Sequence, residues 1–309
     1  TGDAGATTFN GIPFHLNSDD NSSSIYTADV SGTDNLARSN TGYGMTSLDA
    51  ITTGDNNAVF GFAAATALNT GVENTAIGRG AMQSATSASY CVAVGNNAGN
   101  AMTTGDMYNV FVGHSSGIAV TSGIYNTFAG YQSGLATNTG AQNTFLGRVA
   151  GGANTSGGVN IAIGDAAYDG ADTESNNLAI GVGALGGAVA GGEFNVAVGN
   201  TTLDALTSGD KNTAIGYGAG TVLTSANNCT IVGHKAADEL TEGNANTAIG
   251  DEALTNLTTG VGNTALGAVA GDNLTTGGQS LFIGQDTKAS AGGGTYQFVI
   301  GHNVTSAGN

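Results

Sequence analysis

The chain has 309 residues, of which 53 are glycine, 1 is proline and none is tryptophan. Only 9% of the residues are charged, and 23 acidic against 6 basic side chains give a net charge of −17. A surface this acidic repels the phosphates of nucleic acids and the headgroups of anionic lipids, so we exclude both as partners. No apolar run approaches the roughly 20 residues of a membrane-spanning helix, so no membrane insertion is expected. The hydrophobic content of 40% nevertheless favours a folded chain over a disordered one.

Residues 1–43 lack the repeat that organises the rest of the chain. We interpret them as an N-terminal cap or attachment segment, because the end of a stacked repeat array needs a cover. The polar stretch 17–24 within this segment is expected to be a loop. The apolar and aromatic residues available for the cap are Phe9, Ile12, Phe14, Leu16, Ile25 and Tyr26.

Residues 44–301 consist of a short internal repeat. The phrase Asn-Thr-Ala-Ile-Gly occurs at 74–78, 212–216 and 246–250, and relaxed versions of it lie between them. We call its last residue the marker glycine. Successive markers are 17 residues apart in twelve intervals and 18 apart in two, which sets the period of the repeat. The fifteen markers are Gly61, Gly78, Gly95, Gly113, Gly130, Gly147, Gly164, Gly181, Gly199, Gly216, Gly233, Gly250, Gly267, Gly284 and Gly301. Residues 302–309 form the C-terminal end, either complete or truncated.

The columns of the repeat predict an all-β fold. The two residues before each marker are apolar, the third residue before it is mainly β-branched, and a small residue stands three positions after it. A second glycine usually follows ten positions after the marker, as at Gly71 and Gly260. A unit of 17 residues cannot bury a core alone, but stacked units turn every column into a continuous stripe. We therefore predict a parallel β-solenoid, or β-roll, of about fifteen coils, with two short β-segments per coil and glycine turns where φ is positive.

The strands of this solenoid carry apolar side chains on both faces. Successive side chains of a strand point to opposite sides, yet residues such as 161–163 and 196–198 are apolar throughout. One face can fill the coil, and the other then needs a cover. A second copy of the chain, arranged with closed cyclic symmetry, is the economical cover.

The pattern Asn-x-Ala-Ile/Val-Gly-x-x-Ala with glycine turns resembles the head repeats of trimeric autotransporter adhesins. It is even more similar to the NTAIG-x-x-A…LTTG repeats of bacteriophage tail fibres, seen here at 246–253 and 257–267. The resemblance covers roughly residues 44–301 and implies a left-handed parallel β-roll, a homotrimer and an extended fibre that bears a receptor-binding surface. The chain departs from the adhesin heads in its longer period, and neither a heptad stalk nor a membrane anchor follows the repeats. The self-cleaving chaperone domain that often ends such tail fibres is missing as well.

No set of residues in the sequence predicts catalysis, a cofactor or a metal. The histidines of the repeat are in non-adjacent coils, and the carboxylates are scattered rather than converging as a glycoside hydrolase requires. Asp251 is expected to pair with His234 one coil away. Cys91 and Cys229 occupy a column otherwise filled by asparagine, eight coils apart, so we predict no disulfide between them.

These observations predict a non-enzymatic fibre or adhesin that acts outside the cell, most simply a phage tail or head fibre on the virion surface. Its predicted partners are itself in a homotrimer, other virion or surface-structure proteins, and a host-surface glycan or protein. The alternatives are the head of a bacterial trimeric autotransporter adhesin on a cell surface and, less favoured, a carbohydrate-cleaving tailspike. The column after the marker varies freely and is the candidate recognition stripe. The stripe consists of Arg79, His114, Tyr131, Arg148, Tyr217, His234 and His302. Merely solvated surface, with binding at a tip or in another domain, is the alternative interpretation of this column.

Overall fold

The computed structural model describes residues 7–9, 12–16, 24–26, 37–188 and 190–307. It confirms the predicted fold class, because the described residues form an all-β parallel solenoid of about 16 turns without helices. The chain divides into two compact units, residues 1–156 and 157–309.

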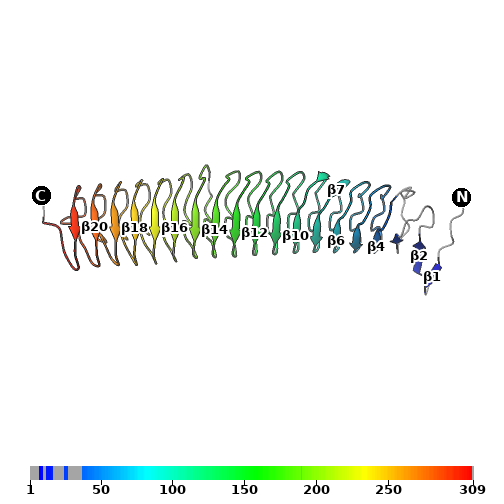
Figure 1. The fold of residues 1–309 in the computed structure, drawn as a ribbon, viewed down its shortest axis with the longest axis horizontal. Coiled ribbons are helices and arrows are strands. Elements are labelled where there is room, and N and C mark those ends of the chain that lie inside the picture. The colour runs from blue at the N-terminus through cyan, green and yellow to red at the C-terminus, as the bar shows by residue number, and fades with distance from the viewer. Residues whose placement is uncertain (1–6, 10–11, 17–23, 27–36, 189, 308–309) are drawn as a thin grey trace. The chain divides into compact units, whose positions relative to one another are not determined.

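In the first unit, each coil contributes one three-residue strand to a continuous parallel sheet (Figure 1). Neighbouring strands pair in exact repeat register, for example Thr75 beside Val92 and Ile77 beside Val94. Gly44, with φ of +136°, follows the first of these strands as a further marker glycine. The strands are β4 (Thr41–Tyr43), β5 (Ala58–Phe60), β6 (Thr75–Ile77), β8 (Val92–Val94), β10 (Val110–Val112), β11 (Thr127–Ala129) and β12 (Thr144–Leu146).

The second unit repeats this arrangement without change of register (Figure 1). Its strands are β13 (Ile161–Ile163), β14 (Leu178–Ile180), β15 (Val196–Val198), β16 (Thr213–Ile215), β17 (Thr230–Val232), β18 (Thr247–Ile249), β19 (Thr264–Leu266), β20 (Leu281–Ile283) and β21 (Phe298–Ile300).

In every strand of this sheet from β4 to β21 the central residue faces the inside of the coil and the two flanking residues face outward. In β13, Ala162 is fully buried, whereas Ile161 is exposed and Ile163 half-buried. The residue before the marker and the one three before it therefore lie on the outer face. We call these two outward columns the strand face.

The prediction of two β-segments per coil is wrong. Among the described residues a second strand pair occurs once, between β7 (Ser87–Ser89) and β9 (Thr104–Asp106). Elsewhere the segment after the marker forms turns in which every second residue has positive φ, as in Ala63 (54°) and Ala65 (47°). The left-handed conformation costs about 1–2 kcal/mol per non-glycine residue. Alternate N–H groups offset that cost by bonding to the coils on either side: Ala63 N donates to Met45 O at 2.9 Å, and Ala65 N to Ala81 O at 2.8 Å.

Glycine recurs at two positions of the repeat, and each position requires it for a different physical reason. The marker glycines have φ near +140°, which side chains rarely adopt, as predicted. The second glycines, such as Gly71 and Gly123, do not have positive φ. They are needed because a Cβ there would overlap a carbonyl oxygen of the next coil, that of Ala88 or Gly140. The expectation of positive φ at this second column is therefore wrong.

A buried asparagine ladder runs beside the strands in both units. Asn57 Nδ2 donates to Gly71 O at 2.9 Å, and Asn57 Oδ1 accepts the backbone N–H of Asn74 at 3.0 Å. Each rung thus joins its coil to the next and satisfies backbone groups that the turns leave open. Cys91 and Cys229 each replace one rung and are buried free thiols.

The first strands of the chain continue the sheet with a change of direction. β1 (Thr7–Phe9) and β2 (Ile12–Leu16) form an antiparallel pair, β2 pairs antiparallel with β3 (Ile25–Tyr26), and β3 pairs parallel with β4. Because β4 pairs with β5 in repeat register, the repeat begins within residues 1–43, and the role of this segment as a cap or attachment segment stays a prediction. The loop expected at 17–24 lies outside the described residues except for Ser24.

Candidate binding surface

The seven residues of the recognition stripe are all exposed, four in the first unit and three in the second. Each follows a marker glycine, which turns the chain away from the sheet and leaves the next side chain outside the coil. Tyr131 is 50% exposed and Tyr217 55% exposed, which is ample for contact with a partner. A role of the stripe in recognition stays a prediction.

Neighbouring members of the stripe stack in pairs. The rings of His114 and Tyr131 lie 5.5 Å apart in the first unit, and those of Tyr217 and His234 lie 5.8 Å apart in the second. His234 Nδ1 is 3.0 Å from Asp251 Oδ1, which confirms the predicted cross-coil pair. Because both side chains are more than half exposed, this pair contributes little to stability. Within the described residues, no three histidine, cysteine or acidic side chains come together as a metal site would require.

A hollow of about 300 Å³ opens beside the stripe in the first unit, and the sequence analysis missed it. It forms around Gly80, two positions after a marker, where the adjacent coils carry Ala63 and Asn97. Gly80 adds no side chain to this outward column, and the side-chain oxygens of Asn97 and Gln83 lie 2.5 Å and 3.3 Å from where its Cβ would stand. The other lining residues of the hollow are Phe62, Arg79, Gln83, Asn100 and Ile118.

A hollow of the same size forms in the second unit for the same reason. Gly218 stands at the equivalent position, between Thr201 and Lys235 of the adjacent coils. The chemistry differs, since Asp238 and Glu239 line this hollow together with Lys235. A glycine two positions after the marker is the sequence signal for both hollows, and it gains meaning only once the neighbouring coils are superposed.

Three tyrosines form a ladder in the first unit, also missed from the sequence, in which Tyr108 and Tyr125 are exposed and Tyr90 is half-buried. The rings of Tyr90 and Tyr108 are 4.9 Å apart, and those of Tyr108 and Tyr125 are 5.3 Å apart, each pair nearly parallel. Desolvation within the stack raises the pKa of Tyr108, and the nearby Asp106 carboxylate adds to the effect. The stacked rings cover each other's faces, so mainly ring edges and hydroxyl groups are exposed to solvent.

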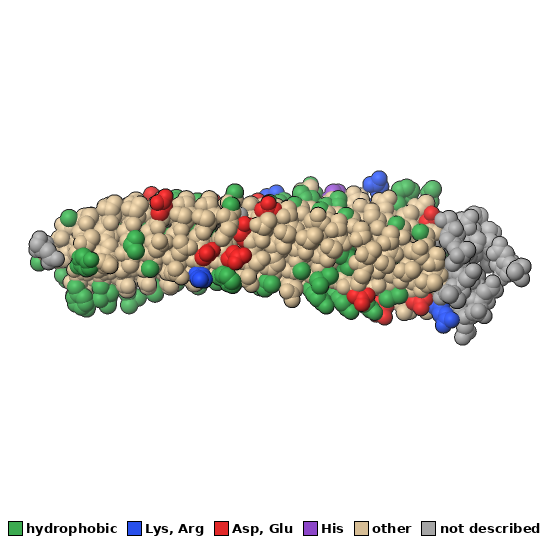
Figure 2. Space-filling model, turned by 90° about the horizontal axis from the view of Figure 1, so that it is seen from above, with side chains coloured by type: hydrophobic (Ala, Val, Ile, Leu, Met, Phe, Trp, Pro, Cys, Tyr) green, Lys and Arg blue, Asp and Glu red, His purple; other side chains and the backbone are tan. Residues whose placement is uncertain are grey.

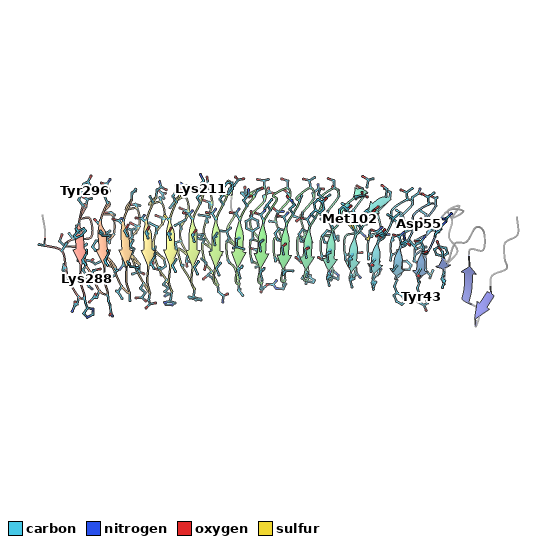
Figure 3. The ribbon with its side chains drawn as sticks, in the orientation of Figure 1. Tyr43, Asp55, Met102, Lys211, Lys288 and Tyr296 are labelled. Atoms are coloured by element: carbon cyan, nitrogen blue, oxygen red, sulfur yellow. The ribbon has the colours of Figure 1, made fainter. Side chains whose placement is uncertain are left out.

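The strand face carries no charge in either unit: its column before the marker is apolar throughout, and its other column is apolar or threonine. No Asp, Glu, Lys or Arg occurs in either of its two columns from β4 to β21. Large side chains on it are exposed, among them Phe60 at 55%, Ile215 at 41% and Leu266 at 47%. Tyr43 stacks on Phe60 with ring centroids 4.7 Å apart, and Figure 3 shows Tyr43 at the outer rim of the first coils. Figure 2 shows scattered red and blue side chains on one face of the molecule.

No family model matches the sequence, and the search of curated proteins gives no match either. In the part of the chain that the structure describes, no helix has the length and apolar character required to cross a bilayer.

Proposed function

We propose that this protein is a non-enzymatic structural fibre whose chains assemble as a homotrimer and display a host-binding surface outside the cell, on a phage virion. The observation that supports the proposal most is the uncharged strand face. A sheet face half open to water ordinarily alternates apolar and polar side chains, and exposed apolar patches of this kind mark interaction sites.

A second and a third copy of the chain are the occupants we assign to the strand face. A partner that repeats with the same spacing along the sheet of each unit is needed, and another copy of this chain has that spacing. Mutual contact between copies also explains why charges are excluded from the columns, because an unpaired charge buried in an interface costs several kcal/mol.

Two substitutions at neighbouring positions of β13 distinguish an effect on folding from an effect on assembly. Ala162→Asp places a charge inside the coil and is expected to unfold the second unit locally. Ile163→Asp places the charge on the strand face, once in each copy, and is expected to leave the coil folded while dissociating the trimer. Val182→Asp is the matched control, because Val182 is 50% exposed in the stripe column, where Asp165 and Asp251 already occur.

Light scattering gives the readout. The unmutated chain and Val182→Asp are expected at three times the chain mass of 30.1 kDa, and Ile163→Asp at the mass of one chain with an unchanged far-UV circular dichroism spectrum. A stable, soluble monomer of the unmutated chain contradicts the proposed assembly. Immunogold labelling of virions and of bacterial cells tests the proposed location, and labelling of cells alone overturns it.

A further inference from the structure

The hollow around Gly80 has the donors of an anion-binding site. Arg79 contributes a guanidinium group, and Gln83, Asn97 and Asn100 contribute side-chain amides. Asn100 Nδ2 donates hydrogen bonds to Gly80 O at 3.0 Å and to Gln83 Oε1 at 3.3 Å. The second bond fixes the side-chain amides of Asn100 and Gln83 relative to each other. Arg79 forms no ion pair within the described residues, so its guanidinium is available to a ligand.

The charge around this hollow is unlike that of the rest of the protein. It contains one of only 6 basic residues and no carboxylate, in a chain with 23 acidic residues. The equivalent hollow at Gly218 has Asp238 and Glu239 beside Lys235, so its positive charge is compensated. Two hollows built by the same backbone geometry therefore differ in the ligand charge they can accept.

The remaining wall of the Gly80 hollow is apolar. Phe62 is 50% exposed and lies at its rim, and Ile118 lies on the opposite side of Gly80 in the coil order. A guanidinium group, several amides and one open aromatic ring together match a ligand that carries a carboxylate, several hydroxyl groups and an apolar ring face. A volume of about 300 Å³ is at the lower end for ligand sites and suits a single sugar unit.

We propose that the Gly80 hollow binds a carboxylate-bearing sugar unit of a surface glycan. The sugar carboxylate pairs with Arg79, the ring hydroxyls bond to the amides of Gln83 and Asn97, and the apolar face of the ring packs on Phe62. This inference rests on the proposed role as a host-binding fibre and names the ligand class.

The test uses the full chain and a glucuronic-acid-containing oligosaccharide, with its carboxyl-reduced form as the neutral counterpart. Isothermal titration calorimetry is expected to show saturable binding of the acidic form and binding at least about tenfold weaker for the reduced form. Arg79→Gln keeps hydrogen-bond donors but removes the charge, and it is expected to weaken binding of the acidic form by about tenfold or more.

Gly80→Ser tests the hollow itself without disturbing the backbone. Ala63 and Asn97 have the same positive φ in the same column, and a Cβ at Gly80 meets first the flexible end of Asn97, 2.5 Å away. The added side chain displaces the Asn97 amide and narrows the hollow, and it is expected to abolish binding, while Gly218→Ser in the second unit is the matched control and is expected to change nothing. Equal binding of the reduced oligosaccharide, unchanged binding by Arg79→Gln, or absence of binding by the unmutated chain overturns the proposal.

Light scattering on the same samples keeps this test distinct from that of the proposed function. A trimer that does not bind the oligosaccharide refutes the sugar site and leaves the fibre standing. A monomer that binds it refutes the assembly and leaves the site standing.

Discussion

The packing inside the coils predicts that residues 128 and 134 share one space, which either of their side chains can fill. In this chain the two residues are Phe128 and Gly134. Phe128 is fully buried at the centre of β11, between the rings of Phe111 (5.1 Å) and Phe145 (4.8 Å). A Cβ at Gly134, four positions after the marker, would overlap the Phe128 ring. Where the strand centre is alanine, the fourth position instead often carries a large residue with φ near 52°, close to the 61° of Gly134. Such pairs of strand centre and fourth position are Ala76 with Met82, Ala179 with Leu185, Ala197 with Leu203 and Ala248 with Leu254.

The magnitude of each change follows from this geometry. Phe128→Ala removes both ring contacts and leaves a cavity, at a cost of about 3–5 kcal/mol. Gly134→Leu alone forces a side chain against the ring, at a cost of about 1–3 kcal/mol or more. In the double variant the leucine occupies the space of the ring, as Leu203 does beside Ala197. The two changes should therefore compensate, with a coupling energy of about 2–3 kcal/mol.

Hydrogen exchange is the suitable assay, because a stacked array can unfold in parts and a single global transition is not assured. The free energy of local opening is compared for peptides covering 124–147 in the unmutated chain, both single variants and the double variant. Costs that simply add in the double variant would refute the argument that these two positions share one volume.

Three further substitutions test the asparagine ladder and the buried thiols. Asn212→Ala should lower the unfolding free energy by about 2–4 kcal/mol, measured by denaturant titration, because Cys229 N–H and Ala226 O lose their partners. Cys229→Asn should raise it by about 1 kcal/mol in the same titration by restoring a rung, and a loss would contradict the assigned role of the ladder. Burial raises the pKa of the Cys91 thiol from 9.0 to about 11, so the fold disfavours the thiolate. The resulting stability of about 2–3 kcal/mol is present below pH 9 and lost as the pH rises through 11. Thermal unfolding of Cys91→Ala should show a smaller alkaline loss of stability than the unmutated chain, with a residual loss from Cys229, whose pKa burial also raises.

The fold class could be predicted from the sequence because every contact of a coil is repeated one period later. The apolar columns predict the stacked strands, and the marker glycines predict the turns after them. The structure confirms both. The backbone conformation of the turns after the marker could not be predicted, because ordinary residues such as Ala63 and Leu254 adopt positive φ there without any signal in their chemistry. The hollow at Gly80 was missed for a related reason: it is lined by residues from four successive coils, and no one coil contains it.

Charge is distributed over the coil in a way that the folding of one chain does not explain. An outward column tolerates charge in this solenoid, because the stripe column holds Arg79, Asp165 and Asp251 without disturbing the turns. The strand face points outward as well, and a sheet face open to water ordinarily carries polar side chains. Its two columns nevertheless contain no charge at all in a protein of net charge −17. Selection against charge on one outward face and not on another is expected if the first is covered by further copies of the chain. The column after the marker then stays open to solvent, and we expect a change of residue there to leave the assembly unchanged.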